Sequence, residues 1–450
     1  MKPSASAGIR TDAVSTELGS RVRWNVLALM VLVSMITYLD RLNIAIAAPQ
    51  IMSEYHLTST DMGKIFSAFI FAYGLFQLPS GWFADRFGPR LVLSFALIWW
   101  SAFTALTAFI LYLVPPSLIP AVVTLVIVRF CLGMGESAAW PSFNRTIANW
   151  IPSSERALAA SLPLAGGGLG ATVTPPLIAS LMVVYGWRNP FYVSTAVGIA
   201  AAGAWYYYVR NNPSEHPGVN RVEMALIQSG RKETEPPPES GVSTTPWKRI
   251  LSEPNVWLLF LTNFCAGYAI YIYLTWFYTY LVEYRHLNFV RGSLYTMGPF
   301  IAITIMTPLG GLLCDRAAKR FGVTSGRRVI AIGGMSFAAI ALYSGTRLPG
   351  INLSIFAFSL GAGFIFFALS AHWATTIDIT KQYAGTVSGV MNWGGNTGGM
   401  ISPILTPYLA RRFGWSPALE IAAFVLLAGS IVWLLIQPEK PLLRDSRGSG

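Results

Sequence analysis

Charged residues are scarce in this chain. Only 12% of its 450 residues are Asp, Glu, Lys or Arg, whereas about a quarter of the residues are charged in soluble globular domains. Hydrophobic residues make up 53% of the chain, and the mean hydropathy is +0.50. Apolar stretches of about 20 residues, long enough to cross a bilayer as helices, recur along nearly the whole sequence. This composition excludes an ordinary soluble domain and predicts an all-α membrane protein.

Cysteines and acidic residues are also few. The three cysteines, Cys131, Cys265 and Cys314, all fall within apolar stretches, which excludes a disulfide framework. Acidic residues are outnumbered by Lys and Arg, 20 against 32, so the net charge is +12. The basic residues lie between the apolar stretches and form no basic domain, so they indicate membrane topology and no nucleic-acid partner.

The apolar stretches form two sets of six, separated by a polar segment. The first stretch contains Asp40-Arg41 and leads to no Ala-x-Ala cleavage site, so it is expected to be a retained helix. The predicted organisation is a cytoplasmic tail (1–23), a six-helix bundle (24–209), a cytoplasmic linker (210–252), a second six-helix bundle (253–437) and a cytoplasmic tail (438–450). The predicted helices are 24–48, 62–84, 90–113, 118–140, 156–182, 190–209, 255–282, 293–314, 327–346, 350–376, 383–409 and 417–437.

Basic residues are concentrated in alternate loops. The amino terminus, the loops after the second, fourth and eighth helices, and the linker carry most of them, which predicts that both termini are cytoplasmic. Four arginines fall on the other side and run against this rule without reversing it: Arg285, Arg291, Arg411 and Arg412.

One motif occurs twice, at the same place in each half. Gly81-Trp-Phe-Ala-Asp85-Arg86-Phe-Gly-Pro89-Arg90 follows the second helix, and Gly311-Leu-Leu-Cys-Asp315-Arg316-Ala-Ala-Lys-Arg320 follows the eighth. Both segments resemble the G-x-x-x-D-R-x-G-R-[RK] signature of the major facilitator superfamily, from which Pro89 departs. The resemblance implies two six-helix bundles with a substrate site between them near mid-membrane. It also implies gating roles for Asp85, Arg86, Arg90, Asp315 and Arg316, whereas the alternative is a merely solvated turn.

Four charges lie inside predicted membrane helices, where they are costly and indicate function. Asp40 and Arg41 lie in the first helix, and Arg129 and Glu136 lie in the fourth, two helical turns apart on one face. The planar guanidinium groups suit a bidentate contact with a substrate carboxylate. A buried acid beside an arginine can exchange a proton at working pH, so Asp40 and Glu136 are candidate proton carriers. The alternative is a quartet of ion pairs that only fixes helix packing.

The sequence around these charges resembles one branch of the superfamily, the anion:cation symporters, which includes carriers of galactonate, glucarate and hexuronate. The segments that carry the resemblance are Tyr38-Leu-Asp40-Arg41-Leu-Asn43, Arg129-Phe-x-Leu-Gly-x-Gly-Glu136, Thr275-Trp276-Phe277 and Met391-Asn392-Trp-Gly-Gly-Asn396. The resemblance implies proton-carrying roles for Asp40 and Glu136. It implies substrate contacts at Tyr38, Arg41, Tyr73, Arg129, Ser370, Trp373 and Asn392. Some galactonate carriers have Gln in the fifth helix, where this chain has Gly166-Gly-Gly168-Leu-Gly170, so the substrate is expected to differ from galactonate.

Two further residues join the candidate substrate site. Trp276 has support from the motif around it. His372, beside Trp373, has three open roles: a partner for a sugar hydroxyl, a titrating group or a satisfied core residue. The glycine pairs Gly166-xxx-Gly170 and Gly395-xxx-Gly399 predict close packing between helices.

The sequence therefore predicts a secondary active transporter that couples an organic anion to protons by alternating access, with a hexonate, hexuronate or aldarate as substrate. The open alternatives are a Na⁺-driven or potential-driven carrier of phosphate or another carboxylate, and a receptor that binds an anion without transporting it. No H-E-x-x-H or complete nucleophile elbow occurs, so an enzyme is not expected. We expect no cofactor other than coupling protons, no metal, a monomer, and a place in the bacterial cytoplasmic membrane.

Overall fold

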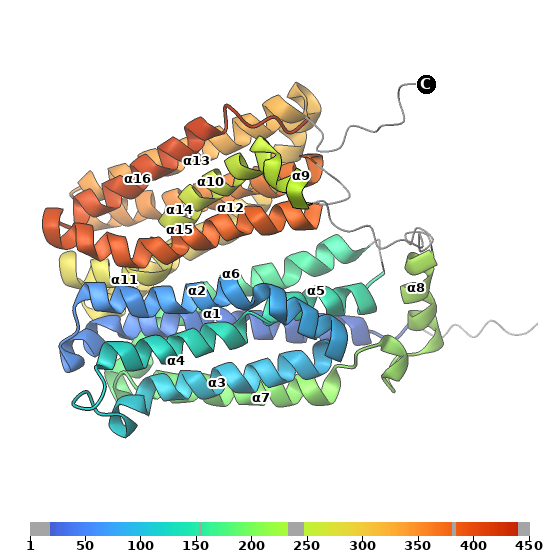
Figure 1. Cartoon of the computed structure of the whole chain (residues 1–450), viewed down its shortest axis with the longest axis horizontal. Helices are drawn as coiled ribbons and strands as arrows, with labels where there is room; N and C mark the ends of the chain where they lie inside the picture. The colour runs from blue at the N-terminus through green and yellow to red at the C-terminus, as the bar shows by residue number, and fades with distance from the viewer. Residues whose placement is uncertain (1–18, 153–154, 233–246, 380–383, 440–450) are drawn as a thin grey trace, which may run out of the picture.

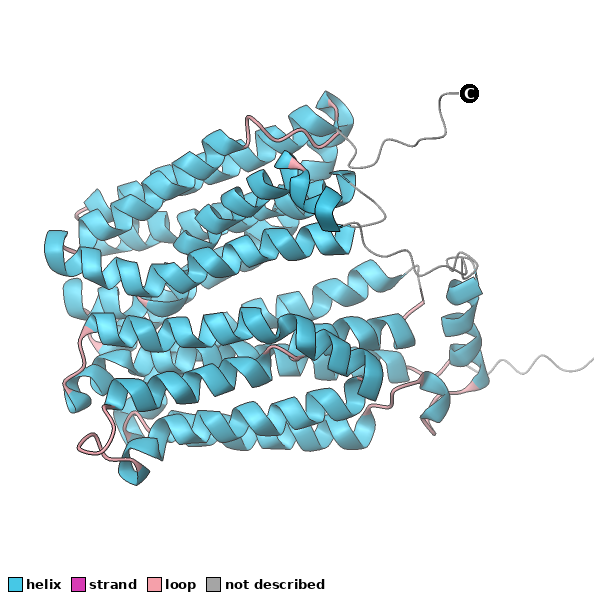
Figure 2. Cartoon of the chain, viewed as in Figure 1, coloured by secondary structure: helices cyan, strands magenta, loops and turns pink. Residues whose placement is uncertain are grey.

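The computed structural model describes residues 19–152, 155–232, 247–379 and 384–439. All regular elements in these ranges are helices (Figure 2). The predicted tails lie mostly in residues 1–18 and 440–450, outside the described ranges. The helices form two bundles that lie side by side (Figure 1).

The first bundle, here the N-terminal half, contains seven helical segments. They are α1 (Val22–Tyr55), α2 (Ser59–Phe87), α3 (Pro89–Leu113), α4 (Ala121–Glu136), α5 (Ala139–Trp150), α6 (Arg156–Tyr185) and α7 (Asn189–Tyr208). The second bundle, here the C-terminal half, consists of α10 (Pro254–Thr275), α11 (Phe277–Thr279), the π-helical turn η3 (Tyr280–Tyr284), α12 (Phe289–Phe321), α13 (Val323–Arg347), α14 (Ile351–Ile379), α15 (Ala384–Phe413) and α16 (Trp415–Val432). The segment that connects the two halves along the chain contains η2 (Pro213–Glu215), α8 (Arg221–Lys232) and α9 (Trp247–Ser252).

Nine helices in the described ranges are long and apolar enough to cross a membrane, and α2, which is bent, would be a tenth. The helices α7 and α15, which match the sixth and eleventh predicted spans, are outside this set. α7 ends in three tyrosines and α15 is rich in Gly and Asn, which lowers the hydropathy of both. With its many apolar helices, the chain is an integral membrane protein.

Glycines at equivalent places join helices in the two halves. Gly88 lies between α2 and α3 with φ 82°, and Gly322 lies between α12 and α13 with φ 83°. Only glycine adopts this left-handed conformation without strain. The first turn lies within one copy of the repeated motif and the second lies just after the other, so the duplication seen in the sequence is also a duplication of backbone geometry.

Glycines also bring helices into close contact. A Cβ on Gly166 would lie 2.8 Å from the carbonyl oxygen of Val31, and one on Gly170 would lie 2.7 Å from that of Met35, so α6 packs directly on α1. A Cβ on Gly395 would lie 2.6 Å from Asn263 of α10. The close packing predicted for these glycines is present in both halves.

Several predicted helix ends were wrong. α1 continues through Pro49 to Tyr55 instead of stopping at 48, and α16 ends at Val432 instead of 437. The fourth predicted helix, expected to end at 140, breaks after Glu136 and continues as α5 to Trp150. The seventh, predicted to run unbroken to 282, breaks at Trp276 and continues as α11 and η3 to Tyr284.

The two halves touch at one end of the bundle and diverge toward the other (Figure 1). We call the end that holds α8, α9 and the start of α1 the terminal end, and the other the distal end. At the distal end Ser67 of α2 donates a hydrogen bond to the carbonyl of Met400 on α15, at 2.6 Å. A Cβ on Gly63 would lie 2.1 Å from the Pro403 carbonyl oxygen, which leaves no space between α2 and α15 there.

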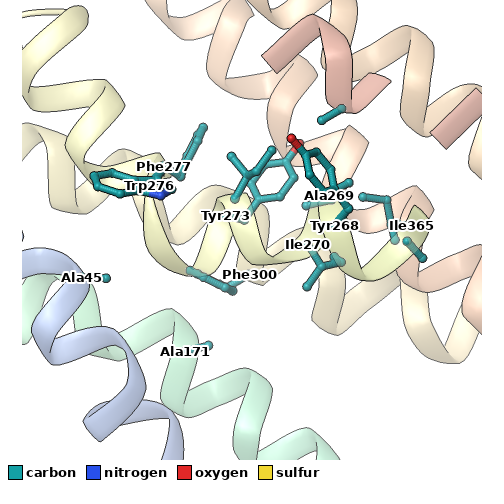
Figure 3. Packing of buried hydrophobic residues seen from close by; sticks show 14 of the residues in the cluster. Ala45, Ala171, Tyr268, Ala269, Ile270, Tyr273, Trp276, Phe277, Phe300 and Ile365 are labelled. Carbon is teal, nitrogen blue, oxygen red and sulfur yellow. The ribbon is translucent and has the colours of Figure 1, made fainter. Parts of the chain in front are cut away.

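The hydrophobic core runs through both halves near this contact. Tyr273, Trp276 and Phe277 pack inside the C-terminal half, with Ala45 of α1 and Ala171 of α6 on the facing side (Figure 3). Small residues on the N-terminal half therefore face large aromatic residues on the C-terminal half, which allows the two surfaces to approach closely.

The linker folds onto the terminal end of the N-terminal half. The carboxylate of Glu223 in α8 accepts hydrogen bonds from the backbone amides of Val22 and Arg23, at 3.2 and 3.1 Å, and so caps the first turn of α1. Arg23 also forms an ion pair with Glu155 just before α6, at 3.2 Å. The segment was predicted to be a polar linker, and its first part is in fact anchored to the bundle.

Candidate functional site

The structure brings the four predicted membrane charges together. Asp40 and Arg41 on α1 face Arg129 and Glu136 on α4, and Asp40, Arg129 and Glu136 are at most 2% exposed. The Arg41 Nε donates to Glu136 Oε1 at 2.5 Å. We call Asp40, Arg41, Arg129 and Glu136 the charge cluster. Its formal charges sum to zero when both acids are ionised.

Asp40 and Arg41 point toward different neighbours. Consecutive residues of a helix are rotated by about 100°, so the Asp40 carboxylate lies beside Trp100 and Thr104 of α3. The Arg41 guanidinium instead extends toward Glu136 and the interface with the C-terminal half. The cluster therefore has one acid, Glu136, in direct contact with an arginine and one, Asp40, set back within the N-terminal half.

Aromatic rings surround the two guanidinium groups. The Arg41 Cζ lies 4.6 Å from the ring centre of Tyr73 and 5.4 Å from that of Tyr38. The Phe69 ring lies between the arginines, 5.4 Å from Arg41 and 4.8 Å from Arg129. Such contacts stabilise a cation at a desolvated site without neutralising it. Both tyrosines were predicted from the sequence, whereas Phe69 was not.

Three polar atoms of the cluster have no hydrogen-bond partner among the described residues. They are Arg129 Nε, Glu136 Oε2 and Asp40 Oδ1. An unsatisfied buried polar group costs about 1–3 kcal/mol, so these atoms are poised to bind a ligand or a proton. Arg41 and Arg129 line a cavity of about 20 Å³, which has room for about one water molecule. The protein is thus closed tightly around the arginines.

The C-terminal half reaches the cluster through Tyr271 of α10. Tyr271 lines the same cavity together with Thr275, and it interacts electrostatically with Arg41. Its ring lies on Gly399 of α15, where a Cβ would be 2.2 Å from it. The Gly395-xxx-Gly399 pattern predicted close packing, but only the fold shows that Gly399 makes room for a residue of the site.

Trp276 lies at the contact between the halves. It is fully buried, its Nε1 donates to the Pro403 carbonyl at 3.0 Å, and its ring meets that of Phe66 on α2 edge to face at 5.3 Å. It is the residue at the break between α10 and α11. The structure therefore places Trp276 where it seals the distal end, next to the cavity and outside its lining.

Three predicted substrate residues of the C-terminal half do not contact the charge cluster within the described part of the chain. Ser370 on α14 donates to the Thr307 carbonyl at 3.2 Å. Trp373 is 48% exposed, and Asn392 on α15 is half-buried. In this conformation the C-terminal half presents Tyr271 and Thr275 to the arginines instead.

His372 is a core residue of the C-terminal half. It is fully buried, its Nδ1 lies 3.0 Å from the Ala368 carbonyl, and its Nε2 accepts a hydrogen bond from Trp433 Nε1 at 3.2 Å. The two rings pack edge to face at 4.9 Å. Both ring nitrogens are therefore used between α14 and α16, which favours the satisfied core residue among the three roles left open by the sequence.

Replacing His372 with alanine is expected to destabilise the protein and leave substrate affinity unchanged. Removing a large buried side chain costs about 2–5 kcal/mol, and this change would also leave the Trp433 indole without its acceptor. Thermal unfolding in detergent measures the first effect, and calorimetry on the folded fraction measures the second. An unchanged melting temperature together with lost affinity would return His372 to the binding site.

The predicted gating residues of the N-terminal half lie at the terminal end. Asp85 is exposed and forms a loose ion pair with Arg145 of α5, at 3.7 Å. The Arg86 guanidinium lies over Trp82 at 6.0 Å. Arg90 Nε donates to the Tyr206 carbonyl at 2.8 Å. All of these contacts stay within the N-terminal half.

The second copy of the motif makes similar contacts within the C-terminal half. Asp315 pairs with Arg327 of α13 at 3.2 Å, and Arg327 also pairs with Asp378 of α14 at 2.9 Å. Arg316 is exposed. Within the described ranges, no ion pair joins the two halves at the terminal end. This agrees with the divergence of the halves there.

Comparisons with known proteins identify the family to which this architecture belongs. Residues 30–403 match the family described as Major Facilitator Superfamily. The chain is 32% identical to a probable sulfoacetate transporter of Cupriavidus necator, over 93% of this chain and 94% of that protein. It is 29% identical to a probable galactarate/D-glucarate transporter of Bacillus subtilis, over 92% of each chain.

Solved structures agree on the fold. A bacterial homologue of the human lysosomal transporter Spinster, in an inward-facing and occupied conformation, superposes with a TM-score of 0.74 at 16% identity, over 92% of this chain and 97% of that one. The family resemblance inferred from the duplicated motif is confirmed, and with it the assignment as a transporter rather than an enzyme. The chain belongs to the major facilitator superfamily of secondary transporters.

Proposed function

We propose that this transporter is a proton-coupled symporter of a small organic anion, and that the anion is a sugar acid such as a hexonate, hexuronate or aldarate. The observation that carries the proposal is the charge cluster, in which two arginines and two acids lie buried beside a cavity between the halves. Their unpartnered atoms, Arg129 Nε and Glu136 Oε2, can bind an anion and a proton respectively.

The charge balance of the cluster supports coupling. With both acids ionised the cluster is neutral, so an anion that enters it adds unbalanced charge at low dielectric. Protonation of Glu136 weakens its hold on Arg41 and leaves that guanidinium free to bind a carboxylate. Asp40, which interacts with Arg129, is placed to do the same for the second arginine. Proton and anion binding then favour each other.

The proposed substrate contacts follow from this arrangement. Arg41 and Arg129 hold the carboxylate, while Tyr38 and Tyr73 pack beside it and offer hydroxyl groups to the sugar. Tyr271 joins them from the C-terminal half. We propose that Ser370, Trp373 and Asn392 complete the site in another conformation, and that Trp276 acts by sealing the distal end.

We further propose that the chain crosses the membrane twelve times. The ten spans among the described residues that are long and apolar enough are joined by α7 and α15. The basic residues gather at the terminal end, so that end is placed in the cytoplasm of a bacterial cell. The structure would then be closed toward the outside, where Ser67 and Gly63 of α2 lie against α15. A single chain contains both halves of the site, so the monomer is the proposed functional unit.

Uptake into proteoliposomes tests the function. Labelled hexonates, hexuronates, aldarates, sulfoacetate and phosphate are offered under an imposed pH gradient or an imposed Na⁺ gradient. Accumulation of a sugar acid driven by the pH gradient is the expected result. Accumulation driven only by Na⁺ would replace protons as the coupling ion, and binding without any uptake would indicate a receptor.

Replacing Asp85 with asparagine is expected to slow transport and leave substrate affinity nearly unchanged. Asp85 lies near the end of α2, at the terminal end and far from the charge cluster. There it can hold helix ends together in the conformation that is closed at the terminal end. Transport rates in proteoliposomes and affinity by calorimetry separate the two effects. Loss of affinity with normal turnover would contradict the gating role.

A further inference from the structure

A second cavity lies on the outer surface of the bundle, between α2 and α15. It has a volume of about 500 Å³, its exposed lining is almost entirely apolar, and it shares no residue with the cavity at the charge cluster. Phe71 of α2 is 49% exposed on one wall, and Ile404 and Tyr408 of α15 are 36% and 50% exposed on the other. We call this cavity the seam groove, because each wall comes from a different half.

The seam groove has the length of one lipid leaflet. It runs along α2 from Thr60, at the distal end, to Phe71. Eleven residues of helix span about 16 Å, and half of a bilayer hydrocarbon core is about 15 Å. A narrow apolar groove that runs from the membrane surface to mid-membrane has the shape of a site for one acyl chain.

Three basic residues lie near the distal end of the groove. Lys64 is one turn along α2 from Thr60, and Arg411 and Arg412 follow Tyr408 by one turn on α15, so all three lie on or beside the groove faces. Lys64 pairs with Asp61 at 3.0 Å. Arg411 and Arg412 are exposed and form no ion pair with a described residue. They are also two of the arginines that run against the charge rule for topology.

We propose that the seam groove binds a phospholipid with an anionic headgroup, with one acyl chain between α2 and α15 and the phosphate at Arg411 and Arg412. Both arginines lie in the last turn of α15, where they interact favourably with the helix dipole. That interaction alone does not explain why an apolar groove of leaflet length ends beside them. Charge and shape together specify a lipid.

Such a lipid would stabilise the closed distal end. The floor of the groove is the tight contact between the halves, where Ser67 bonds to the Met400 carbonyl and Gly63 lies against Pro403. An acyl chain that packs on both walls binds best when the walls are this close. The bound lipid therefore favours the conformation that is closed at the distal end and opposes its opening.

Lipid titration of the delipidated protein, followed by native mass spectrometry, tests the proposal. The protein is expected to bind phosphatidylglycerol more tightly than phosphatidylcholine. The double variant R411Q/R412Q should lower the phosphatidylglycerol affinity about 25-fold, at about fivefold for each arginine near an anionic headgroup, and should leave phosphatidylcholine binding unchanged. Ala68→Phe, which fills the groove, should weaken binding of both lipids.

The matched control is R285Q/R291Q, which removes two arginines from the same end of the bundle away from the groove. It is expected to leave the lipid preference intact. Equal affinity of the unmodified protein for the two lipids, or the same loss in both double variants, would overturn the proposal. If Ala68→Phe does not fold, Ile404→Phe on the opposite wall fills the groove, and unchanged acyl-chain binding in a folded groove-filling variant also overturns it.

Discussion

Replacing Arg129 with lysine is expected to lower substrate affinity roughly 10- to 150-fold although the charge is kept, because a hydrogen bond to a charged group contributes about 1.5–3 kcal/mol. Arg129 is 2% exposed, its guanidinium stacks on Phe69 at 4.8 Å, and its Nε has no described partner. An ammonium group presents neither the planar fork nor the flat face. Isothermal titration calorimetry with the substrate identified by uptake measures the change.

Arg347→Lys is the matched control for this change. Arg347 pairs with an acid, Glu420, at 2.7 Å, and its guanidinium lies over an aromatic ring, as that of Arg129 does, here Tyr343 at 5.4 Å. It joins α13 to α16 at the distal end, away from the proposed substrate site. The same substitution there therefore measures the effect of replacing a paired arginine with lysine outside that site. Full affinity in a folded Arg129→Lys protein would remove Arg129 from the anion site, and equal losses in both variants would show a general effect of arginine replacement.

The general architecture could be predicted from the sequence because it depends on local features. Apolar stretches of membrane length, polar loops and a motif that recurs after 230 residues are all visible without a fold. The breaks in the helices were not visible in the same way. α10 ends where the Trp276 indole bonds to the Pro403 carbonyl, 127 residues away. Such a contact leaves no local signal.

The end of the first helix also depends on distant contacts. The predicted helix stops at 48, just before Pro49, and proline removes one backbone donor and usually ends a helix. α1 nevertheless continues to Tyr55, and Trp187 and Arg188, just before α7, both donate hydrogen bonds to Glu54. These tertiary contacts hold the last turns of α1 in place and override the local preference.

The charge cluster could be proposed from the sequence because burial of charge is costly wherever it occurs in a membrane helix. Its partners in the C-terminal half were harder to predict. Tyr271 is one of several aromatic residues on α10, and only the packing of α10 against Gly399 selects it. His372 is the opposite case. A histidine in a membrane helix is unusual, so it was included in the candidate substrate site, but its ring nitrogens contact Ala368 and Trp433 within the C-terminal half.

Replacing Glu136 with glutamine is expected to abolish accumulation against a gradient while preserving binding and exchange. Glutamine is neutral like the protonated acid and keeps a side-chain oxygen for Arg41, whose Nε lies 2.5 Å from Glu136 Oε1. It cannot release a proton, so the empty carrier would be unable to complete a proton-coupled cycle. Reconstituted vesicles with an imposed pH gradient measure net uptake, and counterflow in the same vesicles measures exchange.

Two further variants decide what a loss of accumulation means. Glu420→Gln replaces another buried glutamate that is paired with an arginine, but in the C-terminal half at the distal end, and it should accumulate substrate normally. Asp40→Asn removes the acid that lies beside Trp100 and Thr104. If Glu136→Gln accumulates substrate fully and Asp40→Asn does not, the obligatory proton site is Asp40, because a step that survives permanent neutralisation of Glu136 cannot require its titration.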